Sequence, residues 1–426
     1  MFNNLKAMYQ VRHDAKLPRS KLEKVIHRRL KTVLVSAYQY VSYYRELMQS
    51  VGYDPVIDYR GREDLVFFPI TTKEIIKQRG IKAFVKKGGN LTNSFSDTTS
   101  GSTGIPLRIY RTSHERTIQI AKWLRFLFIN GYNIRDKVMS LSSPWRHIEN
   151  KNFIQKIGFL RRLAVDYSLP PEEIVDIFLA YEPDVLYGNR THLDLMAQEL
   201  KRRGIRPKGL KILIGTADII HDRTRRFYRK NFGVELIESY GSVEMGIMAQ
   251  ETPFHDGLHL CEDLTYFEFL DKDGTPVLPG MPGRVVVTDL FGKLMPFIRY
   301  DQGDLATVEQ ESGFDTDFRR KIRQIIGRED DIGLLPDGTR FYYHEFDMVL
   351  SKYEEISQFR ILQQTRNLFK IFIVADTSYI LDIHDDIISQ LKRRFPPVAK
   401  FEIVQVERIT PDLSGKLRMF ISELEK

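Results

Sequence analysis

The sequence predicts an α/β protein with a large N-terminal domain over residues 1–327 and a small α+β C-terminal domain over residues 328–426. Helical patterns alternate with short apolar runs from about residue 135 to 246, which is typical of mostly parallel sheets flanked by helices. Short strands without helices between them follow over 252–327 and predict a β-rich subdomain. Paired strands and one helix beyond residue 327 complete the pattern, in a segment of ordinary domain size.

The N-terminal elements follow from apolar spacing. Residues 20–48 carry apolar side chains at helical spacing, with mostly lysine and arginine between them. Such a basic amphipathic helix lies either on a membrane surface or, as we favour, against its own domain. Further helices are expected over 72–79 and 113–129, and a strand over 107–110.

The remaining elements are assigned in the same way. In the alternating region, strands are expected over 185–187, 210–214 and 235–237, and helices over 171–181, 192–202 and 223–231. Farther along, strands are expected over 257–270, 283–289, 359–363, 368–374 and 400–406. The helix of the C-terminal domain is expected to bury one apolar face formed by Ile380, Leu381, Ile387, Ile388 and Leu391.

Composition narrows the class of protein. Of 426 residues, 42% are hydrophobic and 28% charged, the balance of a globular protein, and no apolar run reaches the length of a membrane span. The single cysteine, Cys261, allows no internal disulfide and fits a reducing, cytoplasmic location. The net charge of +8 is dispersed in pairs such as Arg161-Arg162, without a nucleic-acid-binding signature, so no specific nucleic-acid partner is expected.

A run of hydroxyl and glycine residues is the strongest local signal for a binding site. Its sequence is Thr99-Ser100-Gly101-Ser102-Thr103-Gly104-Ile105-Pro106, which offers almost no apolar surface to a core. Glycines let backbone N–H groups turn towards an anion and hydroxyls add donors, so the run suits a nucleoside triphosphate. It is neither a Walker loop nor a Rossmann fingerprint. From these residues alone, a phosphate loop and a solvated turn both stay open.

Four further clusters lie downstream of this run. Each alone is compatible with a turn, a solvated acid, a linker or a chain end. They are Ser239-Tyr240-Gly241-Ser242-Val243-Glu244, Arg299-Tyr300-Asp301-Gln302-Gly303-Asp304-Leu305, Gly327-Arg328-Glu329-Asp330-Asp331, and Ser414-Gly415-Lys416.

Together and in this order, the five motifs resemble those of the adenylate-forming superfamily of acyl-CoA synthetases, luciferases and adenylation domains. Within it, the chain is most similar to the phenylacetate–CoA ligase group and its CapK-like relatives. The similarity includes 68–73, 183–188 and 257–263 and so covers nearly the whole chain. The resemblance implies the adenylate-forming enzyme fold with a mobile C-terminal domain. It also implies that ATP activates a small carboxylic acid as an acyl-adenylate, which coenzyme A then accepts as a thioester.

The resemblance also implies roles for individual positions. Lys416 is expected to bridge the carboxylate and the α-phosphate, Glu244 to hold Mg²⁺, and Asp330 to be the hinge. Asp304 is expected to accept the ribose hydroxyls, Tyr240 to stack beside adenine, and Arg328 to lie near ribose and phosphates. The remaining nucleotide-binding positions are Thr99, Ser100, Gly101, Ser102, Thr103, Gly104, Gly241 and Ser242.

Departures from the family pattern leave the acceptor open. Leu107 replaces a frequent lysine, Asp218 replaces the usual glutamate, and residues 332–339 differ from the ligases after the hinge. One alternative is therefore an adenylating enzyme with a non-CoA acceptor in polysaccharide or natural-product synthesis. Another is a nucleotide-binding protein without catalysis. His255, His259 and Cys261 lack the other thiols of a zinc site, so no zinc is expected, and a homodimer stays open.

Overall fold

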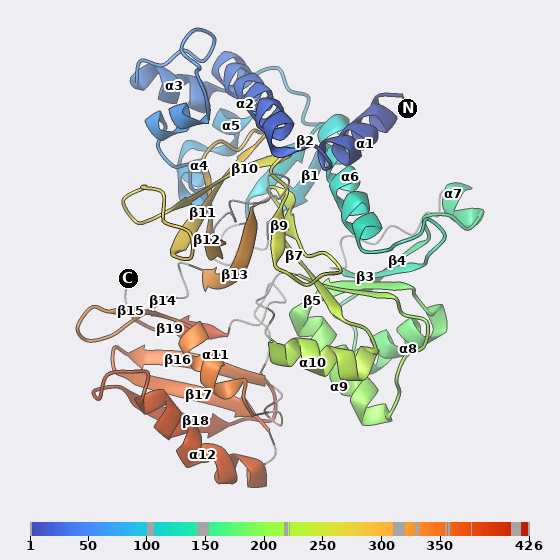
Figure 1. The fold of residues 1–426 in the computed structure, drawn as a ribbon, viewed down its shortest axis with the longest axis vertical. Coiled ribbons are helices and arrows are strands. Elements are labelled where there is room, and N and C mark those ends of the chain that lie inside the picture. Colours follow the sequence, from blue (N-terminus) through green and yellow to red (C-terminus); the bar gives the residue numbers. More distant parts are fainter. Residues whose placement is uncertain are drawn as a thin grey trace. The chain divides into compact units, whose positions relative to one another are not determined.

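The computed structural model describes residues 2–99, 106–142, 153–216, 220, 222–309, 320–328, 332–353, 356, 358–375, 377–409 and 419–424. The chain divides into two compact units (Figure 1): Met1–Tyr132 with Ile237–Ile325, and Asn133–Leu236 with Ile326–Lys426. One division thus falls close to the predicted boundary between residues 327 and 328. The assignment of residues 1–327 and 328–426 as domains stays a prediction.

The first unit combines N-terminal helices with antiparallel strands. Its helices are α1 (Phe2–Asp14), α2 (Arg19–Tyr40), α3 (Ser42–Ser50), η1 (Arg62–Phe67), α4 (Lys73–Arg79), α5 (Ile81–Phe84) and α6 (Ser113–Ile129). Its strands are β1 (Phe95–Thr98), β2 (Arg108–Arg111), β7 (Leu236–Ser242), β8 (Gly246–Gln250), β9 (Leu258–Leu260), β10 (Thr265–Leu270), β11 (Pro282–Asp289), β12 (Tyr300–Val308) and β13 (Lys321–Arg328).

The prediction of a single helix over 20–48 is wrong, because the helix is interrupted at Val41, which separates α2 from α3. Val41 is extended, with φ −116° and ψ 115°. Val41 is nevertheless buried, as is Tyr44 beyond it, so the apolar spacing continues through the break. The apolar face of α2, including Leu22 and Leu30, lies in the unit's main core, which confirms that this helix packs on its own domain. No described helix has the length and apolar character that a membrane crossing requires.

Antiparallel pairing dominates the strands of this unit. They follow the order β10-β11-β12-β13-β9-β8-β7, and β10–β11, β11–β12, β13–β9, β9–β8 and β8–β7 are antiparallel pairs. The predicted succession of strands within residues 252–327 is found, as β9 to β13, whereas their assignment as a separate subdomain stays a prediction. The predicted strand over 257–270 is two strands, because backbone hydrogen bonds from Leu264 and Thr265 to the Cys261 carbonyl form a turn between them.

Buried ion pairs fasten α1, α2 and α6 in the first unit. The Arg125 guanidinium of α6 donates to Asp263 Oδ2 at 2.7 Å and to the Val11 carbonyl of α1 at 3.1 Å. Arg29 of α2 pairs with Asp14 at the end of α1 and also donates to the Asp263 carbonyl at 2.5 Å. Because these charges are removed from water, each depends on its partner. The N-terminal helices are thus tied to the strand region by charge as well as by apolar packing.

The second unit holds the parallel strands and the C-terminal elements. The first group is β3 (Val138–Ser142), α7 (Phe153–Lys156), β4 (Arg162–Asp166), α8 (Pro171–Tyr181), β5 (Val185–Asn189), α9 (Arg190–Arg203), β6 (Ile212–Thr216) and α10 (Asp222–Phe232). The second is β14 (Ile332–Leu334), β15 (Arg340–Tyr342), α11 (His344–Leu350), β16 (Gln358–Thr365), β17 (Leu368–Val374), α12 (Thr377–Lys392), β18 (Lys400–Gln405) and β19 (Phe420–Ser422).

Strands β6-β5-β3-β4 form the predicted parallel arrangement, since each neighbouring pair runs parallel. Helices α8, α9 and α10 share one apolar core with these strands. Proline at the first position of α8 suits a helix start, which explains why this helix was predictable from sequence. On α9, His192 is buried and its ring stacks on Tyr167 with centroids 4.3 Å apart.

The C-terminal strands follow the order β18-β17-β16-β19. Strands β16 and β17 are paired, as predicted, and run antiparallel, while β18 adds parallel to β17. Phe346, Phe369 and Phe420 lie in the core of this region. On α12, Ile380, Ile387 and Leu391 are buried as expected, but Leu381 is 75% exposed and lies outside the apolar face.

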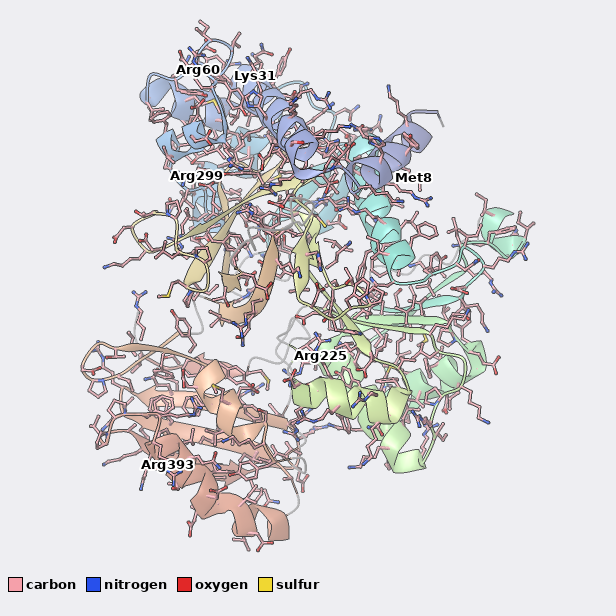
Figure 2. The ribbon with its side chains drawn as sticks, viewed as in Figure 1. Met8, Lys31, Arg60, Arg225, Arg299 and Arg393 are labelled. Atoms are coloured by element: carbon pink, nitrogen blue, oxygen red, sulfur yellow. The ribbon has the colours of Figure 1, made fainter. Side chains whose placement is uncertain are left out.

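Basic side chains come from many elements of the chain. Those labelled in Figure 2 include Lys31 on α2, Arg225 on α10 and Arg393 just beyond α12. Several are in ion pairs, such as Arg394 with Glu345 at 3.0 Å. The excess of positive charge is therefore dispersed along the chain, as its sequence suggests.

The Arg125–Asp263 pair gives a stability prediction. Asp263→Leu leaves a buried guanidinium without its carboxylate and is expected to lower the free energy of unfolding by about 3 kcal/mol. The Arg125→Met/Asp263→Leu double variant should regain part of this loss. Urea denaturation followed by tryptophan fluorescence measures both. Arg62→Met, which breaks an exposed pair with Glu23, is the control and should cost below about 1 kcal/mol. Equal losses at the two sites would contradict the prediction.

His192 gives a prediction for pH dependence. Burial lowers the pKa of His192 from 6.5 to about 4. Between these values the unfolded chain binds more protons than the folded one, so stability rises with pH and is lost as pH falls from about 6.5 to 4. The shift corresponds to about 3 kcal/mol. His192→Gln should remove this component from the unfolding free energy measured from pH 4 to 7. An unchanged pH slope in the variant would refute it.

Candidate active site

The predicted phosphate loop lies between two paired strands. Strands β1 and β2 are antiparallel, with Thr98 opposite Arg108. The Thr99 N–H donates to the Leu107 carbonyl at 3.0 Å, and the Leu107 N–H donates to Thr99 Oγ1 at 2.9 Å. Thr99 is thus buried at the base of the loop, where its hydroxyl closes the hairpin. Ser100, Gly101, Ser102, Thr103 and Gly104 lie outside the described residues.

Glu244 lies in a tight turn between β7 and β8. Ser242 Oγ accepts the Met245 N–H at 3.2 Å and so closes this turn. Two glycines make it possible. A Cβ on Gly241 would lie 2.4 Å from the Gly246 carbonyl oxygen, and Gly246 has a φ of +68°, which favours glycine. The sequence places a carboxylate just past a tight turn; in the structure this carboxylate, Glu244, lies within the turn itself.

A tyrosine positions the Glu244 carboxylate. The Tyr300 hydroxyl donates to Glu244 Oε1 at 2.9 Å. Burial and the nearby Glu244 charge raise the pKa of Tyr300, which keeps the hydroxyl protonated as a donor. The preceding residue, Arg299, has a left-handed φ of 46° and is anchored by Glu268 at 3.0 Å. No described residue donates a hydrogen bond to the other oxygen, Glu244 Oε2.

Two more predicted residues meet in the same unit. Tyr240, on β7, donates its hydroxyl to Asp304 Oδ2 on β12 at 2.8 Å. These residues are 64 positions apart in sequence, so the fold brings together two motifs that were recognised separately. Tyr240 is largely buried. An acceptor-only carboxylate next to a ring is a suitable arrangement for a ribose beside a base.

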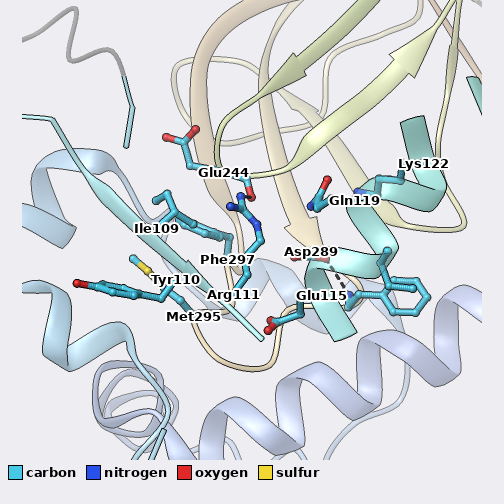
Figure 3. Close-up of a pocket in the computed structure, with 12 residues that line it drawn as sticks. Ile109, Tyr110, Arg111, Glu115, Gln119, Lys122, Glu244, Asp289, Met295 and Phe297 are labelled. Atoms are coloured by element: carbon cyan, nitrogen blue, oxygen red, sulfur yellow. Dashed lines mark hydrogen bonds between the residues drawn. The ribbon is translucent and has the colours of Figure 1, made fainter. Parts of the chain in front are cut away.

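Residues that no motif indicates surround the turn. Arg111 on β2, with Gln119 and Lys122 on α6, donates to main-chain carbonyls of residues 243–245. With Glu244 and Asp289 they line a small cavity (Figure 3). Sequence reasoning missed them because their partners are distant backbone atoms. The available signal was three polar residues on a strand and helix directly after the hydroxyl-rich loop.

The other predicted site residues lie either at the end of β13 or outside the described residues. Arg328 is the last residue of β13 and is half-buried. Asp330, Asp218 and Lys416 lie outside the described residues. Their predicted roles stay predictions.

The possible metal ligands are the group His255, His259 and Cys261 and, separately, Glu244. His255 lies 3.4 Å from Glu251 and His259 lies 2.8 Å from Asp256, while Cys261 is buried. In the described part of the chain, no three histidine, cysteine or acidic side chains gather as a metal site. Glu244 fits Mg²⁺ in another way, since this ion is commonly held by one or two carboxylates together with substrate phosphates.

The Tyr300–Glu244 contact gives a testable coupling. A hydrogen bond to a charged group contributes about 1.5–3 kcal/mol. In a double-mutant cycle with Tyr300→Phe and Glu244→Gln, we expect a coupling free energy of about 1.5 kcal/mol, measured by urea denaturation. The parallel cycle of Tyr240→Phe and Asp304→Asn tests the second pair. Additive effects of Tyr300→Phe and Glu244→Gln would show that their contact does not contribute to stability.

Comparison with known proteins extends the similarity across most of the chain. Residues 336–423 match the CapK C-terminal domain family. The phenylacetate-coenzyme A ligase of Thermus thermophilus is 25% identical over 367 residues, which cover 82% of this chain and 79% of that protein. The ligase of the same name from Escherichia coli is 24% identical over 351 residues, which cover 79% and 78%.

Solved structures give the same picture. The structure of 2-hydroxyisobutyryl-CoA ligase in the postadenylation state, in complex with 2-HIB-AMP, has a TM-score of 0.80 and 19% identity, covering 96% of this chain and 91% of that chain. This agreement confirms the predicted fold class. The chain has the fold of the adenylate-forming CoA ligases, its sequence resembles the phenylacetate–CoA ligases, and residues 336–423 resemble the CapK C-terminal domain family.

Proposed function

We propose that this protein is an ATP-dependent, AMP-forming acid–thiol ligase that activates a small carboxylic acid and passes the acyl group to coenzyme A. The observation that carries the proposal is that four motif residues are hydrogen-bonded in two pairs within one unit. The pairs are Tyr240–Asp304 and Tyr300–Glu244. The sequence similarity to two phenylacetate-coenzyme A ligases over about four fifths of the chain supports it.

The nucleotide would be held by the residues of the first unit. The hydroxyls and glycines from Thr99 to Gly104 would bind the β- and γ-phosphates, and Glu244 would hold Mg²⁺ through Oε2. Bound there, Mg²⁺ would supply positive charge that offsets phosphate charge. Asp304 would accept the ribose hydroxyls, and Tyr240 would lie beside the adenine. Gly241 and Ser242 would present the backbone next to the nucleotide.

The C-terminal domain would contribute the remaining cations. Arg328, at the end of β13, would contact ribose and phosphate oxygens. Lys416 would bring its ammonium between the substrate carboxylate and the α-phosphate, whose mutual repulsion opposes adenylation. We propose residues 328–426 as the mobile domain that delivers this lysine, with Asp330 as the hinge.

The proposed reaction has two transfers. A carboxylate oxygen attacks the α-phosphorus of ATP, the bond to the β-phosphate oxygen breaks, and pyrophosphate leaves with the acyl-adenylate formed. The sulfur of coenzyme A then attacks the acyl carbon, its proton is lost, and AMP leaves as the thioester forms. A phenyl or small hydroxy acid is the substrate class that the names of the similar ligases suggest.

A non-CoA acceptor is the second candidate. The CapK C-terminal match over 336–423 and the unusual segment 332–339 favour it, because in the ligases this region helps to form the thioester. The same adenylation would then serve an amine, a hydroxyl or a carrier protein in polysaccharide or natural-product synthesis. A cytoplasmic location and a homodimer are further predictions.

Pyrophosphate release with a panel of aryl and small hydroxy acids tests adenylation. We expect one acid to trigger release, with Lys416→Ala and Glu244→Gln lowering the rate at least about 100-fold, since each removes charge stabilisation from the transition state. His255→Gln, at a histidine outside the proposed site, is the control and should retain the rate. No release with any acid would refute the proposed function.

Mass spectrometry then separates the two acceptors. With the active acid, ATP and coenzyme A, a thioester should replace the acyl-adenylate. An acyl-adenylate that persists with coenzyme A present would reject the CoA ligase and support the second candidate.

A further inference from the structure

Three side chains hold consecutive main-chain carbonyls of the turn that presents Glu244. Arg111 donates to the Glu244 carbonyl at 2.9 Å and also to that of Val243. On the Met245 carbonyl, Gln119 Nε2 donates at 3.2 Å and Lys122 Nζ at 3.0 Å. Turn carbonyls are ordinarily satisfied by water, so this convergence is a specific arrangement.

The arrangement is costly for stability. The Lys122 side chain is buried, and desolvation lowers the pKa of its ammonium, although the charge of Asp289 opposes that effect. Buried charges are weak contributors to stability and can often be replaced by apolar side chains of similar volume at little cost. A buried ammonium on a turn carbonyl is therefore better explained by positioning than by stability.

The turn backbone packs closely against these donors. A Cβ on Gly246 would lie 1.7 Å from Gln119 Oε1 and would displace this amide, and the φ of +68° at Gly246 itself favours glycine. Arg111 is in turn fixed by Asp97 of β1, at 2.8 Å. The same guanidinium therefore holds both the strand that leads into the hydroxyl-rich loop and the Glu244 turn.

We propose that Arg111, Gln119 and Lys122 are positioning residues that fix the Val243–Met245 backbone, so that Glu244 Oε2 points at one defined place while Tyr300 holds Oε1. This inference rests on the proposed role of Glu244 as the Mg²⁺ ligand. Groups that orient a metal ligand typically change metal affinity 10–100-fold when removed. They act on the affinity for the metal–nucleotide complex more than on the stability of the fold.

Lys122→Met is the decisive variant, because it removes the ammonium and keeps the volume. Its control is Arg125→Met, which removes another buried cation three residues farther along α6 that contacts Asp263 and Val11 instead of the turn. We expect Lys122→Met to raise the dissociation constant of Mn²⁺·ATP, followed by electron paramagnetic resonance, about tenfold. Arg125→Met should lower the unfolding midpoint but leave that constant unchanged.

Gln119→Met should have a smaller effect on Mn²⁺·ATP binding than Lys122→Met, because it removes a neutral donor from the Met245 carbonyl and leaves the charged one in place. Hydrogen exchange of the peptide covering residues 242–246, in the nucleotide-free protein, should be faster in Lys122→Met than in the wild type. Unchanged Mn²⁺·ATP affinity and exchange in Lys122→Met, in a wild-type background that binds the nucleotide, would overturn the positioning role. A wild type that neither binds Mn²⁺·ATP nor releases pyrophosphate would instead refute the proposed function, while hydrogen exchange would still test the positioning.

Discussion

The guanidinium of Arg111 connects two parts of the chain on which the candidate site depends. It binds Asp97 on the strand before the hydroxyl-rich loop and the carbonyls of the turn that carries Glu244, more than 130 positions away. Its planar set of donors suits several acceptors at once, which a lysine could not match. Burial lowers the pKa of Arg111 by desolvation, which the charge of Asp97 opposes, so the cation depends on these contacts. One buried side chain thus links the strand before the hydroxyl-rich loop to the Glu244 turn.

Elements with local signals were predictable from sequence, whereas those decided by tertiary packing were not. Helices α6 and α8 have the predicted bounds, because a capping box at Thr112 and a proline at the start of α8 mark their first turns. The break at Val41 was missed because the residues on both sides are buried and keep helical spacing. Leu381 was wrongly placed on the buried face of α12. Spacing alone does not show which side of a helix packs against the core at every position.

The candidate site shows the same division. Tyr240, Glu244 and Asp304 belong to motifs with recognisable local sequence. The motifs do not specify the contacts that these residues make, which are the hydrogen bonds Tyr240–Asp304 and Tyr300–Glu244. Tyr300 lay within a recognised motif but had no role, because its partner is 56 residues distant. For Lys122 the only signal was its place after the hydroxyl-rich loop, since a lysine in a helix is normally solvated and the fold alone reveals its burial. Residues that orient a binding residue are therefore harder to find from sequence than the binding residue itself.

Helix α6 makes polar contacts with two separate parts of the first unit. Lys122 reaches the Glu244 turn, while Arg125, one turn later, reaches the Val11 carbonyl of α1. Ala7 and Val11 of α1 also pack with Ile118 and Ala121 of α6. The N-terminal helix is consequently a support of the helix that supports the turn. In practice, a tag or fusion placed ahead of α1 should be joined through a flexible linker, so that the packing of Ala7 and Val11 against α6 is left undisturbed.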